Sequence, residues 1–234
     1  MPHPLWNTLA QKADLQLSPE QLALFDRYLD LPEEANLTMN LTRIVNRTHA
    51  EVAHIGDALT LLPFLPKAAH RLVDIGSGGG VPGIPLAIAR RDVGVLLVES
   101  TQKKAAFLTR VATELKLENV SVSAWRAEEV GNSNSRESFD IVTARAVGEL
   151  AFLVEWCMPL VKTGGKMLAM KGAKIHEELP RAGKALSLSG AGKPIIHPVE
   201  LPDTSHHVIV EIVKTSTTHH RLPRTASDAK GKIL

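Results

Sequence analysis

The chain has 234 residues, 44% of them hydrophobic and 22% charged, so it can bury the core of one ordinary domain with an extension. Its 27 Lys and Arg against 25 Asp and Glu leave a formal net charge of only +2, so any binding to nucleic acid must use a local basic patch. The single cysteine, Cys157, excludes an intramolecular disulfide and a cysteine-cluster metal site. The longest apolar run, "LTLLPFL" at 59–65, is too short to span a bilayer, and the N-terminus has no signal-peptide pattern, so we expect a cytoplasmic protein.

Residues 1–66 predict a helical N-terminal extension. Ser18 followed by Pro19 is typical of a helix start, and apolar residues recur at helical spacing after it, at positions 22, 25 and 29. A second helix is expected from about 48 to 62. No other type of element is indicated before residue 67.

Residues 67–213 alternate between strand and helix patterns. Helices are expected over 101–117 and 147–161, between β-prone runs with little polar alternation at 71–76, 93–100, 120–125, 139–144 and 165–171. Two more strands flank "PDTS" at 202–205, without room for a crossover helix, so the last strand should be antiparallel. The pattern predicts a doubly wound α/β domain with a mostly parallel, seven-stranded sheet. The polar, basic tail, 214–234, is expected to be poorly ordered.

The run "DIGSGGGVPGIP" at 74–85 follows the first strand, where open α/β sheets bind ligands. Read as Gly78-x-Gly80-x-x-Gly83, it matches a dinucleotide-binding pattern, although one match in so glycine-rich a run is weak. Read as Asp74-x-Gly76-x-Gly78, it places a carboxylate at the strand end, two residues before the first glycine. A negative charge there suits a ligand with a cationic methionine group better than one with a pyrophosphate. Glu99, at the end of the second strand, can accept hydrogen bonds from the ribose hydroxyls of an adenosine. These residues leave NAD and S-adenosylmethionine both open.

Further motifs occur in order along residues 36–172: "NLTRI" at 40–44, "HIGDAL" at 54–59, "DIGSGGGVPGIPLAI" at 74–88, "LLVESTQKKAAFL" at 96–108, "WRAEE" at 125–129, "TARAVGEL" at 143–150 and "MKG" at 170–172. In these motifs the chain resembles the ribosomal RNA small-subunit methyltransferase G family, also called glucose-inhibited division protein B. That family consists of class I S-adenosylmethionine-dependent methyltransferases with a Rossmann-like fold. The chain departs from the family pattern at Glu99, often aspartate, and at Ser77, often threonine.

The resemblance implies transfer of a methyl group from S-adenosylmethionine to N7 of one guanine in 16S ribosomal RNA. Its partner would be 16S rRNA, alone or in the small ribosomal subunit or an assembly intermediate. The residues expected at the cofactor are Asp74, Gly76, Ser77, Gly78, Val81, Glu99, Ala127, Glu128 and Arg145. The basic residues expected to position the substrate are Lys103, Arg126, Arg145 and Lys171. All four lie at or just beyond predicted strand ends, so they should converge in space.

Simpler interpretations compete at several of these positions. Lys103 could belong to a solvated helix face, and Arg126 could pair with Glu128 or Glu129. Trp125 could stack on a base or pack at a strand end. His206-His207 and His219-His220 do not predict a metal site, because adjacent histidines point in different directions. The basic tail residues are candidates for phosphate contacts: Arg221, Arg224, Lys230 and Lys232.

The chemistry of methyl transfer also limits the target. No Asn-Pro-Pro-aromatic run, which methyltransferases of exocyclic amines use, follows the fourth strand, and Cys157 lies on an apolar helix face rather than in a nucleophile loop. Guanine N7 needs neither device, because its lone pair is nucleophilic at neutral pH. An RNA methyltransferase, which we expect to be a monomer, is thus favoured over an NAD-dependent oxidoreductase, a methyltransferase of another RNA, or a non-catalytic adenosine-binding module.

Overall fold

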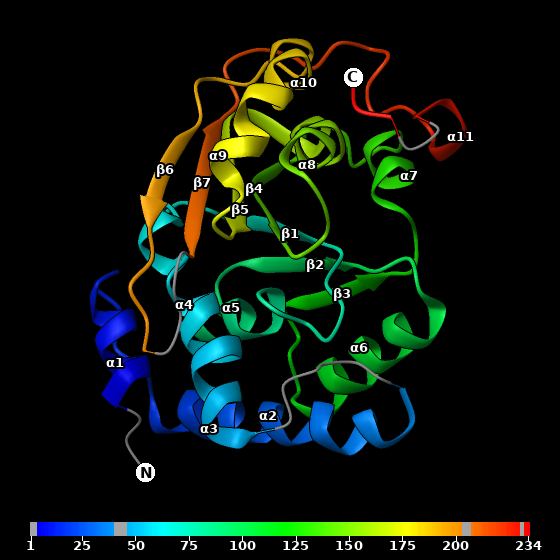
Figure 1. The fold of residues 1–234 in the computed structure, drawn as a ribbon. Helices are drawn as coiled ribbons and strands as arrows, with labels where there is room; N and C mark the ends of the chain where they lie inside the picture. The colour runs from blue at the N-terminus through cyan, green and yellow to red at the C-terminus, as the bar shows by residue number, and fades with distance from the viewer. Residues whose placement is uncertain (1–3, 40–45, 203–206, 230–231) are drawn as a thin grey trace.

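The computed structural model describes residues 4–39, 46–202, 207–229 and 232–234. Seven strands in this part of the chain form one sheet in the order β3-β2-β1-β4-β5-β7-β6 (Figure 1). The strands are β1 Arg71–Ile75, β2 Gly94–Val98, β3 Val120–Ser123, β4 Phe139–Arg145, β5 Val161–Lys171, β6 Ile195–Pro198 and β7 Val208–Val213. Strands β1 to β5 are parallel, and β7 is antiparallel to both β5 and β6. The predicted mostly parallel, seven-stranded sheet with an antiparallel last strand is confirmed.

Helices cover both faces of this sheet (Figure 1). One layer contains α1 Pro4–Gln11, α2 Pro19–Met39, α3 Arg47–Ala50, α4 Asp57–Leu59, α5 Gly83–Ala89 and α6 Gln102–Glu114. On the other side lie α7 Ala127–Gly131, α8 Leu150–Cys157, α9 Ile175–Glu178 and α10 Gly183–Leu188, with α11 Ala226–Ala229 near the C-terminus. Successive strand residues face opposite layers, because side chains alternate across a strand. Leu72 and Ile141 therefore join one core cluster, while Val73 and Val142 join the other.

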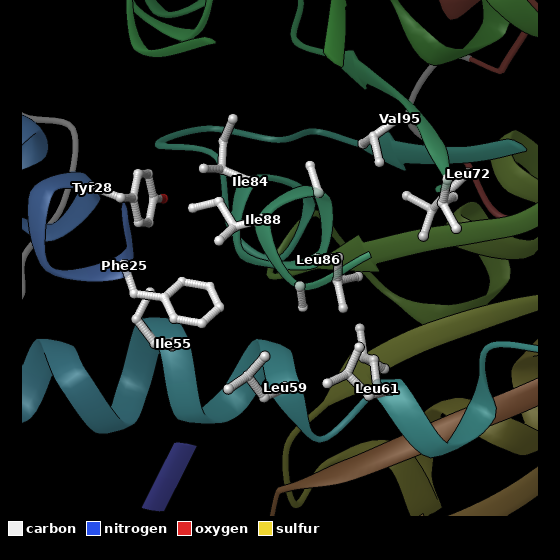
Figure 2. Packing of buried hydrophobic residues seen from close by; sticks show 14 of the residues in the cluster. Phe25, Tyr28, Ile55, Leu59, Leu61, Leu72, Ile84, Leu86, Ile88 and Val95 are labelled. Atoms are coloured by element: carbon white, nitrogen blue, oxygen red, sulfur yellow. The ribbon is translucent and has the colours of Figure 1, made fainter. Parts of the chain in front are cut away.

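The N-terminal helices share a core with the sheet. Figure 2 shows Phe25 and Tyr28 of α2 beside Ile84 and Ile88 of α5, and all four belong to one buried cluster. The helix that Ser18 was predicted to start is confirmed: the Ser18 N–H donates to Gln21 Oε1, and the Gln21 N–H donates to Ser18 Oγ. The division at residues 66 and 213 stays a prediction.

The second predicted helix, about 48–62, is present in a modified form. Helix α3 runs directly into a π-helical segment, Glu51–Gly56, and then into α4. A short 3-10 turn, Leu62–Phe64, follows. Hydrophobic periodicity predicts the helix but not its π turn, which changes the hydrogen-bond pattern without interrupting the helical segment.

Two basic side chains of the tail have partners within the domain. Lys214 is 1% exposed, and its Nζ donates to Glu137 Oε1, to the Met158 carbonyl oxygen and to Thr218 Oγ1. Arg224 pairs with the buried Glu155 at 2.7 Å, so it is engaged within the protein rather than free for phosphate. These two side chains bind buried partners in the folded domain, and poor order of the tail as a whole stays a prediction. Lys230 and the "NLTRI" motif lie outside the described residues.

Candidate functional site

The glycine run forms a tight turn between β1 and α5. Gly76, Gly78 and Gly80 have φ angles of +69°, +55° and +103°, in the left-handed region that favours glycine. A Cβ atom on Gly76 would lie 2.6 Å from Val147 Cγ2, so glycine at this position also allows the segment after β4 to pack closely against the turn. The positive φ angles at Gly76, Gly78 and Gly80 explain why glycine occupies these positions of the turn.

Asp74 and Ser77 lie beneath this turn. Asp74 is 1% exposed, and its carboxyl group accepts hydrogen bonds from Thr143 Oγ1 at 2.9 Å and from the Gly83 N–H at 3.3 Å. The Ser77 hydroxyl donates to the Asp74 backbone carbonyl. Burial raises the pKa of Asp74 to about 7, against the lowering effect of these hydrogen bonds. The two side chains therefore support the turn from below, and their predicted contact with a cofactor stays a prediction.

Glu99 follows β2, and its carboxylate is hydrogen-bonded to the backbone of the glycine turn. It is 7% exposed, and its two carboxylate oxygens accept hydrogen bonds from the Gly78 N–H at 3.0 Å and the Thr101 N–H at 2.8 Å. Each oxygen can accept more than one hydrogen bond. Glu99 can therefore hold the backbone of the glycine turn and still accept hydrogen bonds from ligand hydroxyls.

A pocket of about 190 Å³, here called the turn pocket, opens at the carboxyl ends of β1, β2 and β3. It is lined by Ile75, Gly76, Val98, Ser100, Trp125, Arg126, Ala127, Glu128, Val147 and Trp156. Four residues predicted from sequence, Gly76, Arg126, Ala127 and Glu128, thus meet at one cavity. Val81 instead packs partly buried against the core.

A second pocket of about 390 Å³, here called the strand-end pocket, lies at the carboxyl ends of β4 and β5. Arg145 and Lys171 line it, together with Asp57, Glu178 and His207. The Arg145 guanidinium lies 3.2 Å from the Asp57 carboxylate, and Lys171 Nζ lies 2.6 Å from that of Glu178. Arg145 and Lys171 are therefore each paired with a largely buried acid, and the sequence analysis assigned neither acid to the site.

The two pockets are separated by the segment that follows β4. Arg145 and Ala146 line the strand-end pocket, whereas the next residue, Val147, lines the turn pocket. Ala146 has a φ of +56°, a left-handed conformation that costs energy for a residue with a Cβ atom. The backbone therefore passes from one pocket to the other at Ala146. A ligand in the turn pocket and a ligand in the strand-end pocket would lie on opposite sides of this residue.

The predicted cluster of four basic residues is divided. Arg145 and Lys171 share the strand-end pocket, and Arg126 lines the turn pocket with a side chain that is 62% exposed. Arg126 Nη1 also lies 4.0 Å from Glu128 Oε1, which agrees with the simpler ion-pair interpretation of this residue. Lys103 is exposed in the first turn of α6 and lines neither of these two pockets.

Asp57 and His207 are functional candidates that the sequence reasoning missed. Asp57 lies in the "HIGDAL" motif, and an acid on the apolar face of a predicted helix is the signal that could have identified it. His207 Nδ1 lies 3.5 Å from Asp57 Oδ1, and its hydrogen bond with this carboxylate raises the pKa of His207. Its neighbour His206 lies outside the described residues.

Across the part of the chain that the structure describes, no group of three or more His, Cys, Asp or Glu side chains is arranged to hold a metal ion. Helices long and apolar enough to cross a membrane are likewise absent from those residues. Cys157 is fully buried in the core, as the sequence predicted.

Comparison with known proteins identifies the family. The model of the GidB family, described as rRNA small subunit methyltransferase G, matches residues 21–207. The chain belongs to this family. It is 40% identical over 228 residues to the ribosomal RNA small subunit methyltransferase G of Roseiflexus castenholzii, a match that covers 97% of each chain. The corresponding protein of Sorangium cellulosum is 52% identical over 153 residues, which is 64% of each chain.

Known structures agree on the class I methyltransferase fold. A SAM-dependent methyltransferase from Aquifex aeolicus superposes with a TM-score of 0.53 at 14% identity, covering 71% of this chain and 93% of its own. The precorrin-6y C5,15-methyltransferase from Geobacter metallireducens gives 0.51 at 15% identity, with coverage of 69% and 88%. The family assignment decides against the NAD-dependent oxidoreductase that the glycine pattern had left open.

Proposed function

We propose that this methyltransferase transfers a methyl group from S-adenosylmethionine to N7 of a guanine in 16S ribosomal RNA. The observation that carries the proposal is the family match over residues 21–207, which includes the glycine turn and both pockets' strand-end residues. Relatives that match nearly the whole chain are named as methyltransferases of small-subunit rRNA. The cofactor and the target atom rest on the chemistry of the two pockets and on the family resemblance.

The turn pocket would receive the adenosine part of S-adenosylmethionine. The apolar side chains of Ile75, Val98 and Val147 line a cavity that suits a flat adenine ring, and carboxylates stand nearby at Glu99 and Glu128. When bound, S-adenosylmethionine supplies an electrophilic methyl group on a sulfonium. Three residues of the pocket wall would hold the cofactor directly, namely Gly76, Ala127 and Glu128, and the Glu99 carboxylate would accept hydrogen bonds from its ribose hydroxyls. The remaining residues of the turn would keep its backbone in shape: Asp74, Ser77, Gly78 and Val81.

The strand-end pocket suits the target nucleotide. Guanine N7 carries no proton, so its methylation requires positioning rather than a general base, a contribution that reaches roughly 7–11 kcal/mol in well-oriented reactions. The pocket's two acids are paired with cations, which suits them to holding Arg145 and Lys171 in place. These cations would bind guanine O6 or a phosphate, and would stay back from N7, where positive charge develops.

The RNA must present its guanine outside a regular duplex. N7 lies in the major groove, which in A-form RNA is too deep and narrow for side chains to enter, so the target lies in a loop or an opened structure. Arg126 and Lys103 are exposed cations that could contact phosphate around it. The substrate would be 16S rRNA in the cytoplasm, alone or within the small subunit or its assembly intermediate, and the monomeric state stays a prediction.

Activity and target atom can be tested in one assay. Labelled S-adenosylmethionine is supplied to the protein together with small-subunit RNA or particles from cells that lack the enzyme, and the modified nucleotide is then mapped. We expect one 7-methylguanosine in 16S rRNA, and particles from cells that contain the enzyme should accept little label. A methyl group on another atom or another RNA would contradict the proposal.

Replacement of Glu99 tests the cofactor site. Glu99→Ala removes charge-assisted hydrogen bonds of about 1.5–3 kcal/mol, so we expect S-adenosylmethionine affinity to fall roughly 10- to 150-fold. Isothermal titration calorimetry measures this affinity. Glu118→Ala serves as a control, because Glu118 is exposed in the turn between α6 and β3 and does not line the turn pocket. Unchanged affinity in Glu99→Ala would remove Glu99 from the site.

A further inference from the structure

Arg145 is held by two acceptors from one helical segment, residues 47–59. Its Nη1 donates to the Ala53 carbonyl oxygen at 2.7 Å and lies 3.2 Å from Asp57 Oδ2. The Asp57 side chain is 4% exposed and that of Arg145 is 20% exposed, so the pair lies at the inner wall of the strand-end pocket. A guanidinium has five N–H donors, and this arrangement engages one end of the group.

The π-helical segment, Glu51–Gly56, makes this arrangement possible. In a regular α-helix the Asp57 N–H would donate to the Ala53 carbonyl, four residues earlier. Here it donates to the carbonyls of Val52 and His54 instead. The Ala53 carbonyl accepts from Arg145, and the side chain of Asp57 approaches the same guanidinium. Such π turns inside helices occur frequently at functional sites.

Asp57 also connects two strands across the pocket. One of its oxygens faces Arg145 at the end of β4, and the other lies 3.5 Å from His207 Nδ1, just before β7. A guanidinium on a long side chain has many rotamers, and a buried carboxylate with a second partner is a fixed point that limits them. Both contacts use Nη1, and Arg145 also lines the strand-end pocket, so its other N–H groups are available to a ligand bound there.

We infer that Asp57 is a positioning residue for methyl transfer, which fixes Arg145 against the Ala53 carbonyl so that its other donors meet the target nucleotide. The inference rests on the proposed function and extends it to a residue that acts only through another side chain. Neither Asp57 nor Arg145 lines the turn pocket, so we place the effect of Asp57 at the RNA substrate. The expected contact of Arg145 with the cofactor stays a prediction, and the Kd of S-adenosylmethionine distinguishes the two roles.

A double-mutant cycle of Asp57→Asn and Arg145→Ala tests this role. Asp57→Asn is nearly isosteric but lacks the charge, and we expect kcat with small-subunit particles to fall about 10- to 100-fold, since small misplacements cost this much. The Kd of S-adenosylmethionine should change less than about threefold. In the Arg145→Ala background, Asp57→Asn should have almost no further effect on kcat, because the residue that it positions is gone.

A matched control and a spectroscopic measurement complete the test. Glu155→Gln disrupts a buried Arg–carboxylate pair whose two residues line neither pocket, and it should leave kcat near wild type. In wild-type protein labelled with ¹⁵N-arginine, Arg145 should give a guanidinium NMR signal with restricted rotation, whether or not Asp57→Asn folds. Turnover of folded Asp57→Asn within twofold of wild type, additive losses in the cycle, or a freely rotating Arg145 would each overturn the inference. An inactive wild type would instead contradict the proposed function.

Discussion

Asp74 shows how a single side chain can join several elements. Its carboxyl group at the end of β1 accepts a hydrogen bond from Thr143 of β4 and another from the N–H of Gly83, which begins α5. Burial raises the pKa of this group from the ordinary 3.8 to about 7. The folded protein therefore retains a proton on Asp74 over a pH range in which the unfolded chain has lost it.

This retained proton predicts a pH dependence of stability. The contribution of Asp74 is fully present below about pH 4 and is lost as the pH rises to about 7, at roughly 1.4 kcal/mol per pH unit. Asp74→Asn cannot ionise, and its amide can still accept from the Gly83 N–H. We expect the stability difference, Asp74→Asn minus wild type, to increase by about 2 kcal/mol between about pH 5 and pH 7, because the slope falls as the pH approaches the folded-state pKa.

Urea unfolding of both proteins across this range measures the difference. Taking the difference cancels the contributions of other titrating groups, such as His207, that both proteins share. A constant difference from about pH 5 to pH 7 would show that Asp74 ionises at its ordinary pKa in the folded state.

Helix α5 lies unusually close to the sheet at its first residue. A Cβ atom on Gly83 would lie 2.3 Å from Leu97 Cδ2 of β2 and 3.0 Å from Asp74 Oδ2. Gly79, four residues earlier in the same run, has no atom within 4 Å of the corresponding position. Glycines that look equivalent in the sequence therefore serve different purposes at the level of the element.

This contrast gives a matched pair of substitutions. Gly83→Ala should lower the free energy of unfolding by about 1–3 kcal/mol, because overpacking must displace α5 or the Leu97 side chain. Gly79→Ala should change it by less than about 0.5 kcal/mol. Urea denaturation measures both values, and equal effects of the two substitutions would show that the packing of α5 on β2 is looser than in this structure.

At the scale of the whole molecule, one sheet joins two cores. Trp6 of α1 is fully buried in the cluster on one face, whereas Trp156 of α8 packs against the cluster on the other. Every long strand contributes residues to both clusters, as Leu168 and Ala169 of β5 illustrate. Neither layer can lose its packing without exposing the apolar face of the shared sheet to water.

The N-terminal helices should therefore unfold together with the domain. Two reporters test this: Trp125→Phe with Trp156→Phe keeps only Trp6, and Trp6→Phe with Trp125→Phe keeps only Trp156. In each, the urea midpoint from tryptophan fluorescence should coincide with that from far-UV circular dichroism of the same protein. A Trp6 transition at lower urea than the circular dichroism transition would show that residues 1–66 unfold separately.

The sequence by itself predicted the local and periodic features. The strands and most helices follow from hydrophobic patterns of neighbouring residues, and the sharp turn at Gly76 and Gly78 follows from glycine's freedom at positive φ. Sequence motifs also brought out Arg145 and Lys171, which do line one pocket. The short helices α9 and α10 escaped prediction, because Pro180 and Gly183 interrupt any helical period there.

Only the tertiary structure decided which groups meet. The Ala53 carbonyl and Arg145 are separated by 92 positions, and their contact depends on a π turn that no hydrophobic pattern reveals. Asp74 was expected at a ligand because it lies near a strand end, and only the fold shows that its carboxyl group is buried under the turn and bonded to Gly83. Local conformation is determined by neighbouring residues, whereas partnership and burial depend on how distant segments pack, so the sequence determined the elements and the turn, and packing alone decided the partners of each charged group.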